Sequence, residues 1–209
     1  QNGTASLFSA LKDIDLSVYD SIAVGPGIGI DNDDWQKSKD YFMDFEGLLI
    51  LDADALNRIS ESKLGSKFFL ERKYQTWITP HSKEFLRLFP QIKCETNLGM
   101  AFKAAKEFNI SILLKGANSI VADQKKVWQL FGTDSQTARA GLGDLLSGFV
   151  AGSSAIDSTI CRNITTDFFA KYVLLHSFAS SKCKTGSNAF AIGDELSKLM
   201  RNRKMRQIS

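Results

Sequence analysis

Gly47-Leu48-Leu49-Ile50-Leu51-Asp52-Ala53-Asp54 is the stretch that decides the fold, because a continuous apolar run at 47–51 gives way at once to two carboxylates. Apolar runs without alternation are typical of strands in a parallel sheet that helices cover on both faces. Three more short runs have the same character, at residues 21–24, 77–79 and 110–114. Together they predict a mostly parallel sheet.

Between the strands, apolar residues recur at helical spacing. The expected helices cover residues 35–45, a segment carrying Phe85, Leu86 and Phe89, then 98–108, 144–156, 165–180 and 193–200, and the inner face of 98–108 is Ala101, Ala104, Ala105 and Phe108. Residues 119–122 and 126–131 flank a turn and predict an antiparallel hairpin at the sheet edge. We therefore expect one α/β domain over residues 1–209, a three-layer α/β/α sandwich.

The composition fits such a domain. The chain has 209 residues, 44% of them hydrophobic and 23% charged, which is enough for a sizeable core. The net charge of +3 gives no electrostatic reason to expect nucleic acid as a partner. Three scattered cysteines without metal-binding spacing indicate reduced thiols, and no apolar run reaches the roughly 18 residues of a membrane span. With a polar start that does not resemble a signal peptide, we expect a cytoplasmic protein without a membrane contact.

Polar or glycine-rich motifs follow each of the four predicted parallel strands, at residues 25–29, 52–57, 79–84 and 115–119. In open parallel sheets, ligands bind just beyond the carboxyl ends of the strands. The coincidence of four such motifs predicts a ligand site at that edge of the sheet.

The first motif, Gly25-Pro26-Gly27-Ile28-Gly29, is not a dinucleotide fingerprint, because its spacing is GxGxG and Pro26 removes a backbone N–H. Two interpretations stay open. A ligand approaches the backbone where glycine has no Cβ, or the segment is a purely structural tight turn.

The next two motifs carry ionisable side chains. Asp52 and Asp54 could hold Mg²⁺ through waters against a phosphate, or Asp54 caps the next helix while Asp52 hydrogen-bonds the loop. His81 lies at a strand end and is either a substrate contact or a structural residue. His176, inside an apolar helix, is expected to be a packed core histidine.

The fourth motif is Lys115, Gly116, Ala117, Asn118 and Ser119. A cation with glycine and small polar residues suits contact with a phosphate, and the alternative is a hairpin entry with a solvated lysine. It is not a Walker A loop, because GxxxxGK[ST] occurs nowhere in the chain.

The sharpest motif runs from Ala138 to Gly148, where glycines precede an apolar helix expected to begin at Gly143 and Asp144. Free N–H groups of a first helical turn, together with the helix dipole, form an anion site suited to nucleotide phosphates. Asp144 is either a plain helix cap or a base that takes a proton from a hydroxyl attacking that phosphate. The dipole favours the ionised form that a base needs.

The motifs VGPGIG (24–29), LDADALN (51–57), TPHSKEF (79–85), LLKGANSIVAD (113–123) and ARAGLGDLLSGFVAG (138–152) occur in that order. This set resembles the ADP/ATP-dependent NAD(P)H-hydrate dehydratase family, the carboxy-terminal module of YjeF-type repair proteins, which has a ribokinase-like fold. The chain departs from the family at residues 134–137, where an Asn-Pro-Gly-Met-like run is usual, and at Ala140 and Leu142. From the resemblance we also expect the family's first βα units to be missing from this chain.

The resemblance implies a lyase that restores hydrated NADH or NADPH at the expense of ATP or ADP. Asp144 would deprotonate the substrate hydroxyl, which attacks the terminal phosphate, and elimination of phosphate would remake the double bond. Gly27, His81 and Asp144 would contact the substrate. Residues Lys115 to Ser119 and Gly143 would contact the adenine nucleotide, with Mg²⁺ as cofactor and no protein metal site.

The resemblance also implies a homo-oligomer and a fused or associated epimerase module. Two other functions stay open beside the dehydratase. A ribokinase-like small-molecule kinase would use the same phosphate site and base but release a stable phosphorylated product. A non-catalytic nucleotide-binding domain of the same fold would keep its function when Asp144 is replaced by asparagine.

Overall fold

The computed structural model describes residues 6–29, 31–131, 141–161, 163–184 and 187–208, the last seven of them by their backbone alone. In this part of the chain, six strands lie side by side in chain order: β1 (Ser21–Val24), β2 (Leu48–Leu51), β3 (Thr76–Ile78), β4 (Ser111–Leu114), β5 (Ser119–Ala122) and β6 (Val127–Leu130). Strands β1 to β4 are parallel, whereas β5 pairs antiparallel with β4, and β6 pairs antiparallel with β5. The predicted parallel sheet with an edge hairpin is confirmed.

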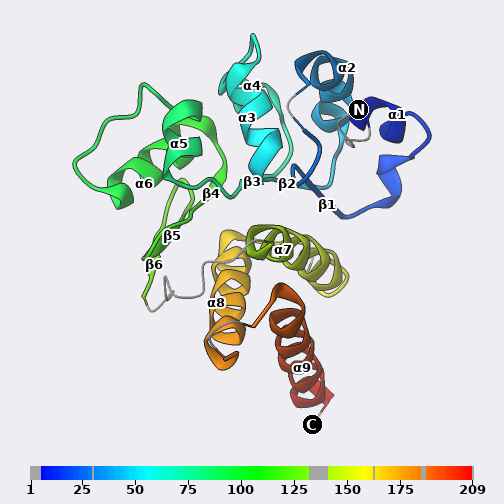
Figure 1. The fold of residues 1–209 in the computed structure, drawn as a ribbon, viewed down its shortest axis with the longest axis vertical. Coiled ribbons are helices and arrows are strands. Elements are labelled where there is room, and N and C mark those ends of the chain that lie inside the picture. Colours follow the sequence, from blue (N-terminus) through cyan, green and yellow to red (C-terminus); the bar gives the residue numbers. More distant parts are fainter. Residues whose placement is uncertain (1–5, 30, 132–140, 162, 185–186, 209) are drawn as a thin grey trace.

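Helices cover both faces of the sheet (Figure 1). One face carries α1 (Leu7–Leu11), α2 (Asn32–Asp44), α3 (Ala53–Glu61), α4 (Lys67–Glu71), α5 (Ser82–Leu88) and α6 (Asn97–Phe108), with a short 3₁₀ turn at Leu16–Val18. The other face carries α7 (Leu142–Ser158) and α8 (Thr166–Lys182), and α9 (Ala189–Ile208) packs mainly on α8. No helix among the described residues is long and apolar enough to cross a membrane.

The unbroken apolar run of β2 divides between two cores. Leu49 and Leu51 belong to the core beneath α2, α3, α5 and α6, whereas Leu48 and Ile50 belong to the core beneath α7 and α8. On the second face, the rings of Trp77 and Phe169 stack with their centroids 4.5 Å apart. A strand buried on both sides has no polar face, which is why alternation is missing from its sequence.

Several helix boundaries differ from the expected ones. Helix α7 begins at Leu142 after the left-handed residue Gly141, so the expected start at Gly143 and Asp144 was wrong by one to two residues. Helix α9 begins at Ala189 rather than at residue 193. Helices α3 and α4 fall outside the ranges expected from the sequence, although Ala55, Leu56 and Ile59 of α3 form a buried stripe.

Candidate phosphate-binding and catalytic site

The four motifs expected at the sheet edge do follow β1, β2, β3 and β4, the four adjacent parallel strands. Parallel strands end at the same side of a sheet, so the motifs share one edge. Beyond β3 and β4 the pairing continues through a bridge between His81 and Lys115, whose N–H donates to the Pro80 carbonyl at 2.8 Å. His81 and Lys115 are therefore held next to each other at this edge.

A buried carboxylate organises the edge. Asp52 is 1% exposed, and its Oδ1 accepts hydrogen bonds from Lys115 Nζ at 2.7 Å and from the Ala53 N–H at 2.8 Å. Its Oδ2 accepts from Ser147 Oγ of α7 at 2.7 Å. Burial acts to raise the pKa of Asp52, but the Lys115 charge and the hydrogen bonds of Lys115, Ser147 and Thr79 outweigh it and hold the pKa below its usual value. We call Asp52, Lys115 and Ser147 the Asp52 cluster.

The amino end of α7 meets this cluster at Gly143. A Cβ added to Gly143 would lie 3.6 Å from Asp52 Oδ2 and 3.8 Å from Lys115 Nζ. The lysine cation therefore lies beside the first turn of a 17-residue helix, whose free N–H groups attract anions. Lys115 is not merely a solvated hairpin residue, because the ion pair with Asp52 holds its ammonium group in place while the side chain stays 26% exposed.

Asp144 follows directly in the first turn of α7 and is exposed. It lies at a groove of about 720 Å³ between α7 and α9, whose walls are mainly apolar or glycine residues such as Phe149, Phe190 and Gly193. The carboxylate is thus not turned into the packed interior. It stands in solvent one residue beyond the point where Lys115 and the helix amino end converge.

The glycine loop, residues 25–29, separates into two kinds of position. At Gly25, with φ +142°, an added Cβ would lie 1.7 Å from the Asp52 carbonyl oxygen, so packing alone demands glycine there. At Gly27, with φ +73°, an added Cβ would meet nothing within 4 Å. Packing therefore explains the glycine at position 25, whereas the open space at Gly27 is compatible with a ligand close to the backbone.

The two aspartates after β2 exchange the structural roles expected of them. Asp52, not Asp54, caps α3 through its own side chain, while Asp54 Oδ2 accepts the Gly29 N–H of the glycine loop at 2.9 Å. Both oxygens of Asp52 already accept hydrogen bonds, from Lys115 and the Ala53 N–H and from Ser147, which leaves Asp52 poorly placed to bind a metal ion. No group of three or more His, Cys, Asp or Glu side chains that could hold a metal occurs among the described residues.

His81 has a structural task at the start of α5. Its Nδ1 accepts the N–H groups of Lys83 and Glu84, and the Glu84 carboxylate accepts the His81 N–H, which completes a capping box. The His81 side chain is nevertheless 48% exposed, at the edge of the sheet where the parallel strands end. A capping role and a substrate contact are compatible in this geometry. His176, in contrast, is buried in α8 as expected, and burial lowers its pKa to about 4.

The turn between β4 and β5 opens into a second hollow, of about 470 Å³. Lys115, Gly116, Ala117 and Asn118 line it, opposite Thr96 and Asn97 at the amino end of α6. Ser119 is buried at the start of β5, and its hydroxyl lies 3.4 Å from the Gly116 carbonyl. Residues 134–137 and Ala140, singled out as departures from the family pattern, lie outside the described residues.

Sequence reasoning missed Ser147 and Thr79 as partners of Asp52. Ser147 stands four residues after Gly143, hence on the same side of α7, and that spacing was a usable signal. The bond between Lys115 and Asp52 joins residues 63 positions apart, and the sequence carries no local sign of it.

The fold is that of ribokinase-like proteins. A crystal structure of a ribokinase-like superfamily protein from Enterococcus faecalis is similar with a TM-score of 0.74, at 23% identity, over 90% of this chain and 64% of that one. The Bacillus subtilis ADP/ATP-dependent NAD(P)H-hydrate dehydratase, co-crystallised with ATP/Mg²⁺, is similar with a TM-score of 0.70, at 21% identity, over 93% of this chain and 69% of that one. At these identities the likeness establishes the fold alone.

The family model for NAD(P)H-hydrate dehydratase matches residues 5–199, and the chain belongs to that family. The bifunctional NAD(P)H-hydrate repair enzyme of Synechocystis is 34% identical over 145 residues, which are 69% of this chain and 27% of that enzyme. The enzyme of the same name from Gloeobacter violaceus is 35% identical over 146 residues, again 27% of its length. The chain thus spans about a quarter of the length of the curated relatives it matches.

Proposed function

We propose that this chain is a lyase that dehydrates hydrated NADH and NADPH at the expense of ADP or ATP. Membership of the family supports the substrate class. The observation that supports the chemistry is the approach of the Lys115 cation to the amino end of α7 at Gly143. Asp144, the next residue of α7, supplies an exposed carboxylate.

The nucleotide binds at the turn after β4 and the start of α7. Lys115, Gly116, Ala117, Asn118 and Ser119 contact it together with Gly143, because these residues combine one fixed cation with backbone groups beside a hollow. The terminal phosphate lies against the helix amino end, where the first N–H groups have no helical partners.

The hydrated nicotinamide binds on the other side of Asp144. Gly27 offers open backbone and His81 an exposed ring at the same edge. Asp144 takes the proton of the ring hydroxyl as that oxygen attacks the terminal phosphorus, and the bond from this phosphorus to the nucleotide breaks. In the second stage the phosphate leaves with the electron pair of its carbon–oxygen bond, the neighbouring ring carbon loses a proton, and the double bond is restored. The sum is dehydration coupled to nucleotide hydrolysis.

Magnesium accompanies the nucleotide in this proposal. The donor set fits a cation that keeps several waters and binds chiefly to phosphate oxygens, because both oxygens of Asp52 are already hydrogen-bonded and Asp144 remains as an exposed carboxylate. When bound, the ion neutralises charge on the phosphates. The chain's own part is to hold the phosphate with Lys115 and the α7 amino end.

The assembly and place of action belong to the same proposal. The relatives are named bifunctional and are far longer than this chain, which supports a fused or associated epimerase module. The three cysteines are free, which suits a reducing compartment such as the cytoplasm. We also propose a homo-oligomer, as the family resemblance implies.

The test mixes the protein with hydrated NADH, Mg²⁺ and either ATP or ADP, and follows recovery of the near-ultraviolet absorbance of reduced nicotinamide together with free phosphate. The proposal predicts equimolar NADH and phosphate with at least one nucleotide. A stable phosphorylated product without NADH would identify a small-molecule kinase instead. Nucleotide binding without turnover of any hydrated cofactor would identify a binding domain.

A further inference from the structure

The glycine loop is held from outside by side chains of α3. Asp54 accepts the Gly29 N–H, and Arg58 Nε donates to the Gly29 carbonyl at 2.5 Å. Arg58 Nη2 donates to the carbonyl of Ile28. Within the loop, the Ile28 N–H donates to the Gly25 carbonyl at 3.2 Å. The backbone next to Gly27 therefore depends largely on one guanidinium.

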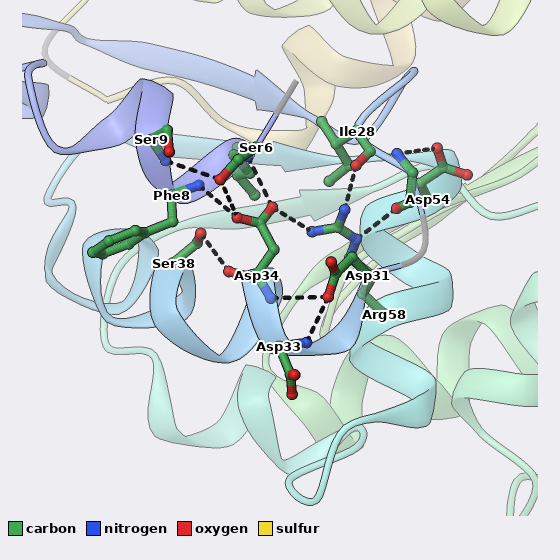
Figure 2. Close-up of polar contacts among 12 residues, drawn as sticks. Ser6, Phe8, Ser9, Ile28, Asp31, Asp33, Asp34, Ser38, Asp54 and Arg58 are labelled. Atoms are coloured by element: carbon green, nitrogen blue, oxygen red, sulfur yellow. Dashed lines mark hydrogen bonds and ion pairs between the residues drawn. The ribbon is translucent and has the colours of Figure 1, made fainter. Parts of the chain in front are cut away.

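That guanidinium is buried and paired. The Arg58 side chain is 1% exposed, and its Nη1 lies 3.4 Å from Asp34 Oδ2 of α2. Asp34 also accepts hydrogen bonds from Ser6 Oγ at 2.6 Å, from the Leu7 N–H at 2.8 Å and from the Phe8 N–H at 3.0 Å. Figure 2 shows Arg58 between the loop carbonyl of Ile28 and this carboxylate. Burial acts to raise the pKa of Asp34, but these hydrogen bonds outweigh it and keep the pKa below its usual value.

The contacts of Arg58 are directed at backbone carbonyls rather than spread over a core. A planar fork can serve two adjacent carbonyls and a carboxylate at once, which an ammonium group cannot do with the same geometry. The two carbonyls immediately follow Gly27, the loop residue with open space in front of it. A small shift of the Ile28 and Gly29 carbonyl groups would change the orientation of the neighbouring peptide group at Gly27.

We propose that Arg58 is a positioning residue for the hydrated nicotinamide, fixing the glycine loop so that the backbone at Gly27 meets the substrate. This inference rests on the proposed function, since it takes the glycine loop as the substrate side of the site. Asp34 orients Arg58 and links it to the start of α1. The nucleotide side, at Lys115 and Gly143, has no part in this arrangement.

The test is Arg58→Lys, with Arg72→Lys as the matched control. Arg72 is also buried and also donates to backbone carbonyls. These belong to Phe42 and Met43 in the last turn of α2 and to Gly47 just before β2, at the end of β2 opposite to Asp52. We expect Arg58→Lys to raise KM for hydrated NADH about tenfold while kcat and KM for the nucleotide change less than about twofold. Arg72→Lys should lower the melting midpoint and leave all three constants unchanged.

A folded Arg58→Lys protein with the wild-type KM for hydrated NADH would overturn the inference, as would equal loss in both variants. If Arg58→Lys does not fold, Asp34→Asn takes its place with the same expected direction. Amide hydrogen exchange at Ile28 and Gly29 serves as a readout that needs no turnover, and we expect faster exchange there in Arg58→Lys than in Arg72→Lys. An inactive wild-type protein would refute the proposed function, whereas unchanged exchange would refute the role of Arg58.

Discussion

Replacing Asp52 with asparagine perturbs the buried carboxylate that connects β2, Lys115 and α7 at the carboxyl ends of the parallel strands. The variant removes the negative charge that Lys115 Nζ approaches to 2.7 Å, and its amide can accept only part of the hydrogen bonds that Lys115, Ser147 and the Ala53 N–H donate to the carboxylate. Removing one partner of a fully buried ion pair costs about 3–5 kcal/mol. Because Lys115 is 26% exposed, water can solvate its ammonium group in the variant. We therefore expect the free energy of unfolding to fall by about 2 kcal/mol.

For a domain of this size, a loss of that order lowers the melting midpoint by about 4–8 °C. Thermal unfolding followed by circular dichroism at neutral pH measures it. Asp167→Asn is the matched control, because its partner Lys126 lies at 3.3 Å but both side chains are more than half exposed. An ion pair in water contributes little, so this variant should melt close to the wild type.

The stability that Asp52 contributes should depend on pH. The pKa of Asp52 in the folded chain lies below its ordinary value of 3.8, so its stabilisation is fully present above pH 3.8 and is lost as the pH falls through the lower folded value. The difference between wild type and Asp52→Asn should stay constant near neutrality and shrink below pH 3.8. A variant that melts with the wild type at pH 7 would refute the organising role given to Asp52.

Two further predictions concern single residues. Gly25→Ala should lower the free energy of unfolding by at least about 3 kcal/mol or abolish folding, because its Cβ would lie 1.7 Å from the Asp52 carbonyl oxygen. Gly27→Ala should fold and lose only about 1–2 kcal/mol, because of its positive φ. Denaturant unfolding of both variants measures the difference, and equal stability would contradict this prediction. Burial holds the pKa of His176 near 4, so the unfolded chain binds a proton first as the pH falls from 6.5 to about 4, and the wild type should lose roughly 3 kcal/mol over that range. His176→Gln should flatten this slope in melting curves, and an unchanged slope would show that other groups cause it.

The sheet was predictable because its signal is local. Continuous apolar runs separated by helical spacing determine parallel strands, and the turn at residues 123–125 determines the hairpin. Helix α4 escaped prediction because five residues are too few for a periodic pattern, even though Phe68 and Phe69 are buried. Helix α3 has a buried stripe at Ala55, Leu56 and Ile59, but its first turn lies within the 52–57 motif, which was interpreted as a strand-end motif and not as a helix.

The polar connections of the site were not predictable in the same way. Asp52 is a strand-end residue by sequence, but its partners come from positions 63 and 95 residues away. The same holds for Arg58 and Asp34, which lie on different helices 24 residues apart. The sequence indicated which residue types lie at the carboxyl ends of the parallel strands. Which of these residues pair with one another depends on how α3, α7 and β4 pack.

The turnover number of Asp144→Asn for hydrated NADH measures whether Asp144 is the base. Asp194→Asn is the control, because Asp194 is an exposed carboxylate on the same groove. If Asp144 is the base, kcat falls by about 10²–10⁴-fold while KM for the nucleotide stays nearly constant, and Asp194→Asn keeps full turnover. An Asp144→Asn protein that still turns over at half the wild-type rate would show that Asp144 is not the base.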